Sequence, residues 1–428
     1  MQSLQVTIEI EGIQTPVGTI RGDSGEDAVF SYDMSYLSSP EAAPISVHLP
    51  LRARPYSPQD TRLFFEGLLP EGFTRRSVAE WMRVTADDYL SMVAGLGSEC
   101  LGAIQILTDR ESSPPPSYRK MGEDLLRAFA REGASRSAEL VTQAHLSLTG
   151  ASGKAGLYYD RRTRTWYLPV GSAPSTHIVK QSHIRLGGIV TNEQLCLQTA
   201  ANLGIPVPKS RILHIDDFRD ENVLFATTRY DRCFPESADL IDGLSVPRRL
   251  HQEDFAQALG ISPAEKYESP GKSYLLQMFS LLRRVSSNPI RDQIKLWNLV
   301  IFQILIGNAD CHLKNYALLY SENLKSVRLA PAYDIISTVQ YPSATREMAF
   351  HLGDEQQIDR IRRKDLEDAA REIGLGRSIA MSAVDTLIAG FPEALAKAAA
   401  SLEEQGFTMA PVFQKQILEY DAASRLRK

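Results

Sequence analysis

The sequence predicts an α+β protein in which an N-terminal α+β part is followed by a strand-rich part and a helical part. Leu4, Val6 and Ile8 alternate with polar residues, which is the period of a half-buried strand. Strand patterns are concentrated between residues 141 and 249, whereas apolar residues at three- and four-residue spacing dominate from 250 to 428. The two periods differ, so the strand-rich and helical parts are expected to form separate lobes.

The N-terminal part, residues 1–108, is expected to be a compact α+β subdomain. Besides its first strand, its patterns predict strands at 28–32 and 45–49 and helices near 64–76 and 86–94. Residues 109–140 then form a linker and a helix. The linker is the Ser/Pro-rich segment ESSPPPS at 111–117, and the helix covers 121–132.

The strand-rich part, residues 141–249, opens with the small-residue loop SLTGASGK at 147–154, ahead of a strand at 155–159. Backbone N–H groups of such loops can approach phosphate oxygens because no bulky side chain intervenes. The loop is neither G-x-G-x-x-G nor a Walker A motif, so an ordinary hairpin loop is the alternative. The candidate nucleotide-binding residues in it are Ser147, Thr149, Gly150, Ala151, Ser152, Gly153 and Lys154.

A second strand, 176–180, ends in Lys180 and resembles the strand lysine that contacts nucleotide phosphates in kinases. The helix predicted at 191–203 has Thr191 or Asn192 as its cap and Glu193 in its first turn. Glu193 is the natural partner for Lys180. The alternative is a surface glutamate favoured by the helix dipole.

Two strands at 211–215 and 223–228 flank a polar turn and are expected to form a hairpin. The second strand runs into the sequence TRYD, which occupies the position of a kinase hinge. Backbone groups there would meet adenine. The candidate residues of this hinge are Thr228, Arg229, Tyr230 and Asp231.

The helical part, residues 250–428, contains the apolar run 294–306, which predicts a buried helix, and helices are also expected at 366–373, 378–389 and 392–404. The loop GNADCHLKN at 307–315 follows the apolar run directly. It places Asp310 five residues before Asn315, and Asp334 follows after a short apolar strand. Phosphoryl transfer needs these residue types: an aspartate that accepts the proton of the attacking hydroxyl, and oxygen ligands that hold magnesium. The alternative is that Asp310, His312 and Asn315 simply stabilise a turn.

The order of these motifs is glycine-type loop, strand lysine, helix glutamate, hairpin, hinge, apolar helix, catalytic loop and metal aspartate. That order predicts a bilobal protein-kinase-like fold with a β-rich small lobe at 141–249 and a helical large lobe at 250–428. The chain also resembles the HipA serine/threonine kinases, the toxins of HipBA-type bacterial toxin–antitoxin modules. The resemblance covers nearly the whole chain and lies in the motifs FFEGLLPEG at 64–72, THIVK at 176–180, RYDR at 229–232, QED at 252–254, KYE at 266–268 and YDIIS at 333–337, together with the two loops.

The resemblance implies a role for each matched residue. Asp310 would be the general base, Asn315 and Asp334 would hold Mg²⁺, and Lys180 would contact the ATP phosphates. His312 and Lys314 would orient the loop or touch the γ-phosphate. Ser147 falls where the family carries an autophosphorylated serine whose modification ejects the loop and inactivates the kinase; Thr149 and Ser152 are the alternative acceptors.

The resemblance also implies partners and a substrate class. The family's partner is a small helix-turn-helix antitoxin, HipB-like, and through it operator DNA. Its best-known substrate, in particular members, is glutamyl-tRNA synthetase, so the expected substrate is a translation-related protein. The sequence departs from the family at Ser152, where Gln is common, and at Thr228, where some members have Glu.

Two other functions remain open. The D-x-H-x-x-N pattern also belongs to lipid and small-molecule kinases, so the acceptor could be a non-protein hydroxyl. A kinase-fold subunit could instead serve mainly as a corepressor with a DNA-bound antitoxin. Because Lys180, Asp310, Asn315 and Asp334 are all present, an active kinase is favoured over an inactive one.

Composition excludes several classes. The net charge of −5 gives no global attraction to nucleic acid, and no apolar run reaches the roughly 18 residues of a membrane span. The four cysteines show no C-x-x-C spacing, and the N-terminus has no apolar signal segment, so a cytoplasmic protein is expected. The pairs Arg161-Arg162 and Arg248-Arg249 are expected on a solvated face.

Overall fold

The N-terminal sheet is antiparallel and is built around strand β1 (Gln2–Ile10). In the computed structural model, which describes residues 2–108, 114–132, 153–182 and 186–428, β2 (Ile13–Gly22) and β4 (Ile104–Thr108) pair with β1 on either side. β3 (Val29–Tyr32) completes the order β3-β2-β1-β4. The predicted first strand is confirmed, and its alternating Leu4, Val6 and Ile8 are all buried.

A second sheet has six strands in the order β5-β7-β6-β8-β10-β9. These strands are β5 (Ser117–Lys120), β6 (Lys154–Asp160), β7 (Thr165–Val170), β8 (His177–Gln181), β9 (Ser210–His214) and β10 (Val223–Thr228). Helix α5 (Glu123–Arg131) places Phe129 in the same apolar core as Leu157, Leu168 and Val179 of the sheet. The strand lysine and the predicted hairpin therefore belong to one sheet.

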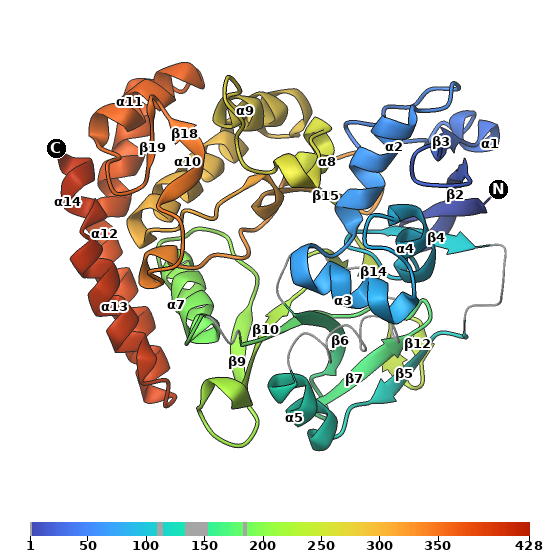
Figure 1. Ribbon diagram of the computed structural model, residues 1–428, viewed down its shortest axis with the longest axis horizontal. Helices are drawn as coiled ribbons and strands as arrows, with labels where there is room; N and C mark the ends of the chain where they lie inside the picture. The colour runs from blue at the N-terminus through green and yellow to red at the C-terminus, as the bar shows by residue number, and fades with distance from the viewer. Residues whose placement is uncertain (1, 109–113, 133–152, 183–185) are drawn as a thin grey trace. The chain divides into compact units, whose positions relative to one another are not determined.

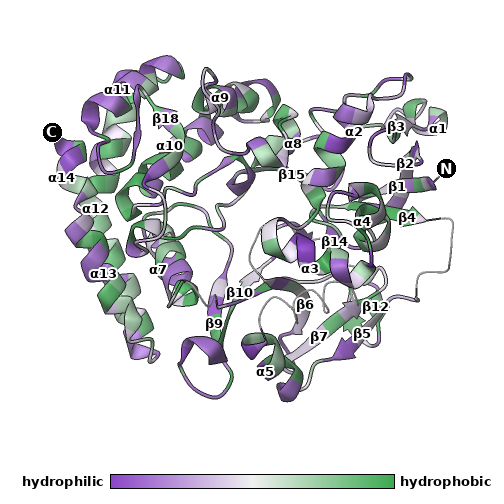
Figure 2. Ribbon diagram, viewed as in Figure 1, coloured by the Kyte–Doolittle hydropathy of each residue, from purple (hydrophilic) through white to green (hydrophobic). Residues whose placement is uncertain are grey.

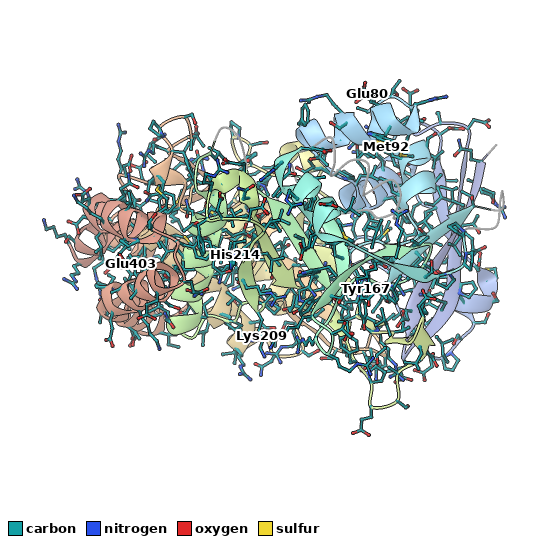
Figure 3. The ribbon with its side chains drawn as sticks, turned by 90° about the horizontal axis from the view of Figure 1, so that it is seen from below. Glu80, Met92, Tyr167, Lys209, His214 and Glu403 are labelled. Atoms are coloured by element: carbon teal, nitrogen blue, oxygen red, sulfur yellow. The ribbon has the colours of Figure 1, made fainter. Side chains whose placement is uncertain are left out.

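The chain divides into two compact units. The first contains Met1–Gln181, Leu213–Pro263 and Leu318–Val327, so it joins the N-terminal sheet to most of the six-stranded sheet. Its further elements are α1 (Met34–Leu37), α2 (Pro58–Phe65), α3 (Gly72–Met82), α4 (Tyr89–Leu96), β11 (Arg232–Cys233), β12 (Leu240–Ile241), β13 (Leu244–Ser245), β14 (Arg248–Arg249), β15 (Gln252–Asp254), α8 (Phe255–Leu259) and β16 (Ala317–Tyr320). β17 (Val327–Leu329) follows β16 in the three-stranded sheet β15-β16-β17. In Figure 3, Glu80 marks the solvent-exposed side of α3 and Met92 marks α4, where this methionine is fully buried.

The second unit contains Ser182–Ile212, Ala264–Ala317 and Arg328–Lys428 and is mostly helical. Helices α12 and α13 run side by side, and α7 and α10 pack against α12 (Figure 1). In Figure 2 hydrophobic segments alternate with hydrophilic ones along α12 and α13. The elements are α7 (Ile189–Asn202), α9 (Tyr274–Val285), α10 (Pro289–Ile306), β18 (Glu347–Leu352), β19 (Glu355–Gln357), α11 (Arg363–Glu372), α12 (Arg377–Glu404), α13 (Met409–Tyr420) and α14 (Ala422–Arg427).

Helix α12 corrects the prediction of two helices at 378–389 and 392–404. It is one helix of 28 residues that continues through Pro392. A proline inside a helix removes one backbone hydrogen bond and crowds the preceding turn. Phe391 and Leu395 on either side of it are nevertheless buried, so the apolar face runs without a break past the proline. Continuous packing of that face offsets the local cost.

Of the helices in the described ranges, α12 alone has the length and composition of a membrane-crossing segment. It passes that test although polar residues, Asp385, Thr386, Glu393 and Lys397 among them, interrupt its apolar sequence. Its buried residues pack against α7, α10 and α13. Core packing therefore accounts for its apolar character.

Two further predictions about local structure are wrong. Residues 45–49 form no strand: the Ile45 N–H donates to Tyr32 Oη at 2.9 Å and the Val47 N–H to Glu253 Oε1 at 3.0 Å, so side chains replace a strand ladder. The helix expected at 64–76 is broken into α2 and α3, because Leu69 precedes Pro70 and adopts an extended conformation.

Candidate active site

Helix α10 delivers the catalytic-loop sequence at a fixed point. It begins with the Asn288 side chain accepting from the Arg291 N–H at 3.3 Å and with Pro289 in its first position. It ends at Gly307, whose φ of 69° is left-handed. A Cβ at Gly307 would lie 2.5 Å from Val339, so only glycine fits this stop.

Backbone and hydroxyl groups then hold the first residues of the loop. The Ala309 N–H donates to Thr338 Oγ1 at 2.9 Å, and that hydroxyl donates to the Gly307 carbonyl at 3.0 Å. The Ala309 carbonyl accepts from the Ala349 N–H at 3.1 Å. Three segments of the second unit thus fix the residue immediately before Asp310.

Asp310 is held at its backbone and at its carboxylate. Its N–H donates to Asn308 Oδ1 at 3.0 Å, and its carbonyl accepts from Asn315 Nδ2 at 2.7 Å. Its carboxylate Oδ1 accepts from the Tyr267 hydroxyl at 2.5 Å. The Asp310 residue is partly exposed, so a group from outside can approach it. A fixed, accessible carboxylate is what a general base requires.

Asn315 and Asp334 have the chemistry of magnesium ligands. Because Asn315 Nδ2 donates to the Asp310 carbonyl, its Oδ1 is the atom that would meet a cation. Asp334 has φ of 55°, a conformation rare outside glycine, and rare backbone conformations concentrate at functional sites. Within the described residues no three His, Cys, Asp or Glu side chains gather as a metal cage. One amide and one carboxylate still fit magnesium, which keeps waters and substrate phosphates as its other ligands.

The segment that carries Asp334 is tied to the catalytic loop and to α7. The Tyr333 hydroxyl donates to the Lys314 carbonyl at 2.8 Å. Asn192 of α7 accepts from the Ser337 N–H at 2.9 Å and donates to the Ser337 carbonyl at 3.0 Å. Asn192 is therefore not the predicted helix cap: α7 begins after Gly188, and the buried amide of Asn192 pairs with the backbone beyond Asp334 instead.

His312 and Lys314 are buried within the loop. The His312 ring stands edge-on to Tyr267, with ring centroids 5.3 Å apart. Cys311, between Asp310 and His312, is fully buried. Burial, reinforced by the Asp310 carboxylate, raises the pKa of the Cys311 thiol to about 12, so no thiolate forms at neutral pH.

The predicted nucleotide residues lie in the first unit. Lys154 of β6 stands directly opposite Lys180 of β8, and Lys180 stands opposite Phe225 of β10. Both lysines are buried. Directly opposed residues share one face of a sheet, and like charges there repel. This part of the sheet therefore presents two lysine side chains on one face.

Of the other predicted loop residues, Gly153 accepts from the Gln181 N–H at 3.2 Å through its carbonyl. The remaining ones lie outside the described residues; these are Ser147, Thr149, Gly150, Ala151 and Ser152. The pairing of Lys180 with Glu193, which lies in the second unit, stays a prediction.

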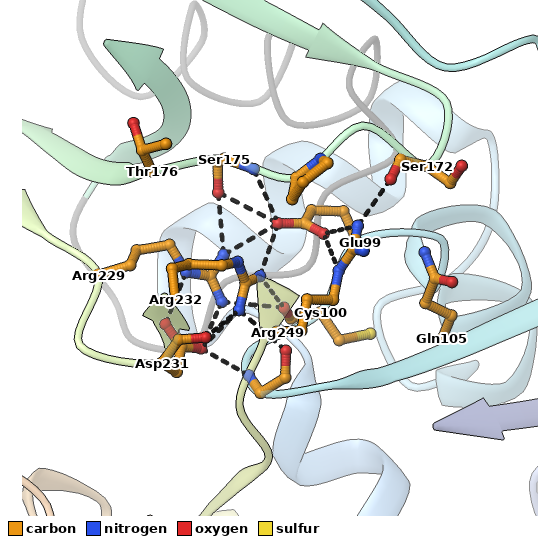
Figure 4. Close-up of polar contacts among 12 residues, drawn as sticks. Glu99, Cys100, Gln105, Ser172, Ser175, Thr176, Arg229, Asp231, Arg232 and Arg249 are labelled. Atoms are coloured by element: carbon orange, nitrogen blue, oxygen red, sulfur yellow. Dashed lines mark hydrogen bonds and ion pairs between the residues drawn. The ribbon is translucent and has the colours of Figure 1, made fainter. Parts of the chain in front are cut away.

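The predicted hinge residues Arg229 and Asp231 use their side chains internally. Arg229 donates to Asp231 through two nitrogens, at 2.9 and 2.6 Å, and to Glu99 at 3.2 Å (Figure 4). Glu99 also accepts from Arg232 at 2.8 Å and from Arg249 at 2.7 Å. We call these five residues the ionic cluster. At Arg229 and Asp231 only backbone groups remain for adenine, and the Arg229 N–H already donates to the Thr176 carbonyl at 2.9 Å.

Thr228 and Tyr230 complete the hinge sequence. Thr228, the last residue of β10, is half-buried and pairs with His177 of β8. The Tyr230 hydroxyl donates to Gln252 Oε1, which belongs to the QED motif at 252–254. The hinge sequence is thus paired with β8 through Thr228 and hydrogen-bonded to β15 through Tyr230.

The ionic cluster keeps its carboxylates charged. Burial opposes ionisation of Glu99, but the guanidinium groups of Arg249, Arg232 and Arg229 outweigh burial and lower its pKa to about 2. Asp231 follows the same logic: burial opposes ionisation, and Arg229 and Arg232 nevertheless hold its pKa well below the ordinary value. Inside the protein its three guanidinium groups face two carboxylates, and Glu9, which pairs with Arg249 at 3.1 Å, adds the third.

The expectation that Arg248 and Arg249 lie on a solvated face is wrong for Arg249. Arg248 is half-buried and pairs with Glu322 at 2.8 Å. Arg249 is buried and pairs with Glu99 and, at 3.1 Å, with Glu9. Alternation along β14 sends the two side chains to opposite faces. The sequence signal for the cluster was the isolated Glu99 inside an apolar stretch, which a buried cation had to neutralise.

Comparison with known proteins covers nearly the whole chain. The model of the HipA-like C-terminal domain matches residues 146–395, and that of the HipA N-terminal domain matches residues 9–107. A putative kinase, Y4mE, of Sinorhizobium fredii is 32% identical over 392 residues, which are 89% of each chain. The serine/threonine-protein kinase toxin HipA of Shewanella oneidensis is 25% identical over 367 residues, covering 83% of this chain and 80% of the toxin.

A solved structure gives the fold independently. It is the Shewanella oneidensis toxin–antitoxin complex of HipA, HipB and operator DNA, and it matches with a TM-score of 0.80 at 22% identity. The match covers 99% of this chain and 97% of that chain. The α+β kinase-like fold predicted from the sequence is confirmed by this match. Together with the two domain models and the rhizobial relative, it shows that the chain belongs to the HipA family of serine/threonine protein kinases.

Proposed function

We propose that this protein is a magnesium- and ATP-dependent serine/threonine kinase that acts as the toxin of a bacterial toxin–antitoxin module. One observation carries the proposal: Asp310 is fixed by hydrogen bonds to Asn308, Asn315 and Tyr267, while its residue remains partly exposed. A buried helix and three backbone segments support this loop, which is more than a solvent-exposed turn needs.

In the proposed reaction a serine or threonine oxygen of the substrate forms a bond to the γ-phosphorus of ATP. The bond between that phosphorus and the bridging oxygen breaks, ADP leaves, and the hydroxyl proton passes to the Asp310 carboxylate. Asn315 Oδ1 and the Asp334 carboxylate would hold magnesium. Magnesium, when bound, supplies charge neutralisation for the phosphates. Holding the acceptor and the base in line supplies most of the remaining rate, because kinases have little covalent chemistry to perform.

The opposed lysines support ATP as the donor. Lys154 and Lys180 place two buried positive charges on one face of the six-stranded sheet. A triphosphate is the anion that a kinase small lobe would set there. The loop before Lys154 would cover it with backbone N–H groups, and the backbone of the hinge sequence from Thr228 to Asp231 would meet adenine.

We further propose that autophosphorylation of Ser147 inactivates the enzyme. A phosphoserine carries about −1.5 to −2 charge at pH 7 and would repel the ATP phosphates. Mass spectrometry of protein produced in a host without other modifying kinases should find phosphate at Ser147 in the inactive fraction. Phosphate on Thr149 or Ser152 instead would move the switch to that residue, and an unmodified loop in active and inactive protein alike would reject autoregulation.

The proposed partners are a small helix-turn-helix antitoxin, HipB-like, and operator DNA bound through it. The similar Shewanella oneidensis structure holds HipA with HipB and operator DNA, which supports this assignment. The net charge of −5 makes direct DNA binding by this chain unfavourable, so the antitoxin would supply the DNA contacts. A corepressor role and kinase activity are compatible in one protein.

The proposed substrate is a translation-related protein, with glutamyl-tRNA synthetase the first to test. The proposed location is the cytoplasm, where the four free cysteines would stay reduced. Phosphopeptide mapping after incubation with ATP tests the function, with and without Mg²⁺ and beside the Asp310→Ala variant. Metal-dependent phosphoserine or phosphothreonine made only by the wild type is expected. Transfer only to a lipid or small-molecule hydroxyl would replace the protein-kinase proposal.

A further inference from the structure

The Tyr267 side chain contacts the proposed base directly. Its hydroxyl donates to Asp310 Oδ1 at 2.5 Å. Hydrogen bonds to an ionised carboxylate are short and about twice as strong as neutral ones. A carboxylate has two oxygens and can accept several such bonds. A bond at Oδ1 therefore holds one of the two carboxylate oxygens in place.

The segment around Tyr267 is packed against the catalytic loop by a backbone hydrogen bond and a ring contact. The carbonyl of Lys266 accepts from the Leu313 N–H at 3.3 Å, three residues beyond Asp310. The Tyr267 ring packs edge-on against His312 at 5.3 Å between centroids and 86° between planes. Backbone and ring contacts thus place the Tyr267 hydroxyl independently of its bond to Asp310.

Glu268 anchors the other side of the segment. Its side chain is buried and accepts from the Tyr274 N–H at 2.6 Å and from the His351 N–H at 2.6 Å. Its own N–H donates to the Ala349 carbonyl at 2.8 Å, and the Ala349 N–H donates to the Ala309 carbonyl at 3.1 Å. The same β18 residue therefore connects the anchor of Tyr267 to the residue that precedes Asp310.

From this geometry we infer that Tyr267 is the positioning residue of the phosphoacceptor site, and the inference rests on the proposed kinase function. Its hydroxyl fixes the rotation of the Asp310 carboxylate, so that the base meets the acceptor hydroxyl in one orientation. The Tyr267 residue is 43% exposed, so an incoming serine or threonine side chain can contact it as well as the base.

A tyrosine hydroxyl on the base could also be a pseudosubstrate that blocks the site. The anchoring argues against this. A pseudosubstrate must leave before each turnover, whereas Tyr267 is flanked by a backbone hydrogen bond at Lys266 and a buried carboxylate at Glu268. Because Tyr267 is anchored on both sides, we expect it to remain beside Asp310 during turnover.

The test compares Tyr267→Phe with Tyr274→Phe. The first removes only the hydroxyl on Asp310 and keeps the ring against His312. The second removes a neighbouring hydroxyl that donates to the Glu265 carbonyl at 2.7 Å, and so controls for loosening of the same segment. Protein kinase kcat, the KM for ATP, thermal stability and phosphopeptide maps are measured for both, with wild type and Asp310→Ala alongside.

Tyr267→Phe is expected to lower kcat about ten- to a hundredfold, because a base that can rotate is misplaced relative to the acceptor, and a misplacement of about 1 Å can cost about 10²-fold. The KM for ATP and the melting temperature should stay at their wild-type values, and Tyr274→Phe should keep the wild-type kcat. An unchanged or raised kcat in Tyr267→Phe would overturn the inference while leaving the kinase proposal intact, as would phosphate mapped to Tyr267. A wild type no more active than Asp310→Ala would overturn the proposed function itself.

Discussion

The ionic cluster of the first unit and the catalytic loop of the second hold carboxylates in opposite ways. Glu99 and Asp231 are surrounded by the guanidinium groups of Arg229, Arg232 and Arg249 and are shut off from solvent. Asp310 receives a neutral phenol hydroxyl and remains partly exposed. In the cluster each carboxylate meets at least two guanidinium groups, whereas in the loop a neutral hydroxyl holds one oxygen of a carboxylate that solvent can reach. The first arrangement stabilises a fold, and the second suits a reaction.

The largest loss in the free energy of unfolding is expected when Glu99 of the ionic cluster is replaced. Glu99→Ala removes the carboxylate that meets three guanidinium groups and leaves buried positive charge behind. Breaking a buried ion pair in this way costs about 3–5 kcal/mol. Urea unfolding should show a lower midpoint at an unchanged slope. The milder Glu99→Gln, which keeps the shape, covers the case in which the alanine variant does not fold.

Asp216→Asn is the matched control for Glu99. Asp216 also meets two arginines, Arg127 at 3.0 Å and Arg131 at 2.7 Å, but on the surface. Exposed pairs contribute little to stability, so its midpoint should match the wild type. Equal losses in the Asp216 and Glu99 variants would mean that burial does not distinguish the ionic cluster.

The loop side of the comparison is tested at Asp334. Asp334→Asn replaces a carboxylate with a neutral amide and removes charge neutralisation for magnesium. Magnesium-dependent nucleotide binding should weaken at least about tenfold, the loss typical even for residues that only contact metal ligands. Calorimetry with and without Mg²⁺ separates magnesium-dependent from magnesium-independent nucleotide binding. The control is Asp359→Asn, at an exposed aspartate of the same unit. Equal weakening in both conditions would make Asp334 structural.

A smaller and more gradual effect is expected in acid. The folded pKa of Glu99 is about 2 against an ordinary value of 4.5, so its contribution to stability is present above pH 4.5 and is lost as the pH falls toward 2. Urea midpoints between pH 6 and 3 should fall more steeply for wild type than for Glu99→Gln. Parallel curves for the two proteins would show that Glu99 is not the group responsible.

The sequence predicts the elements whose patterns are local and strong. The apolar run 294–306 is the end of α10, residues 223–228 are β10, and the alternation from Leu4 is β1. The spacing of Asp310, Asn315 and Asp334 singled out the segments that the structure joins through Tyr333 and Lys314. In each case one short window contains the signal.

The misses depend on partners distant in sequence. Arg249 can be buried because Glu9 and Glu99 both pair with it. Asn192 is inside the helix rather than at its cap, and its amide bonds to the backbone of Ser337. Tyr267 reaches Asp310 across 43 residues. No periodicity in a single sequence encodes such pairings, since each is decided by tertiary packing.

Asp310 is the proposed base of the phosphoryl-transfer site, and removing its carboxylate tests that role. The most direct measurement follows the rate of phosphate transfer from ATP by folded Asp310→Ala beside wild type, with ATP affinity measured by calorimetry on the same samples. We expect a loss of about 10²–10⁴-fold in rate with ATP affinity retained. A rate within a few-fold of wild type in folded Asp310→Ala would contradict it.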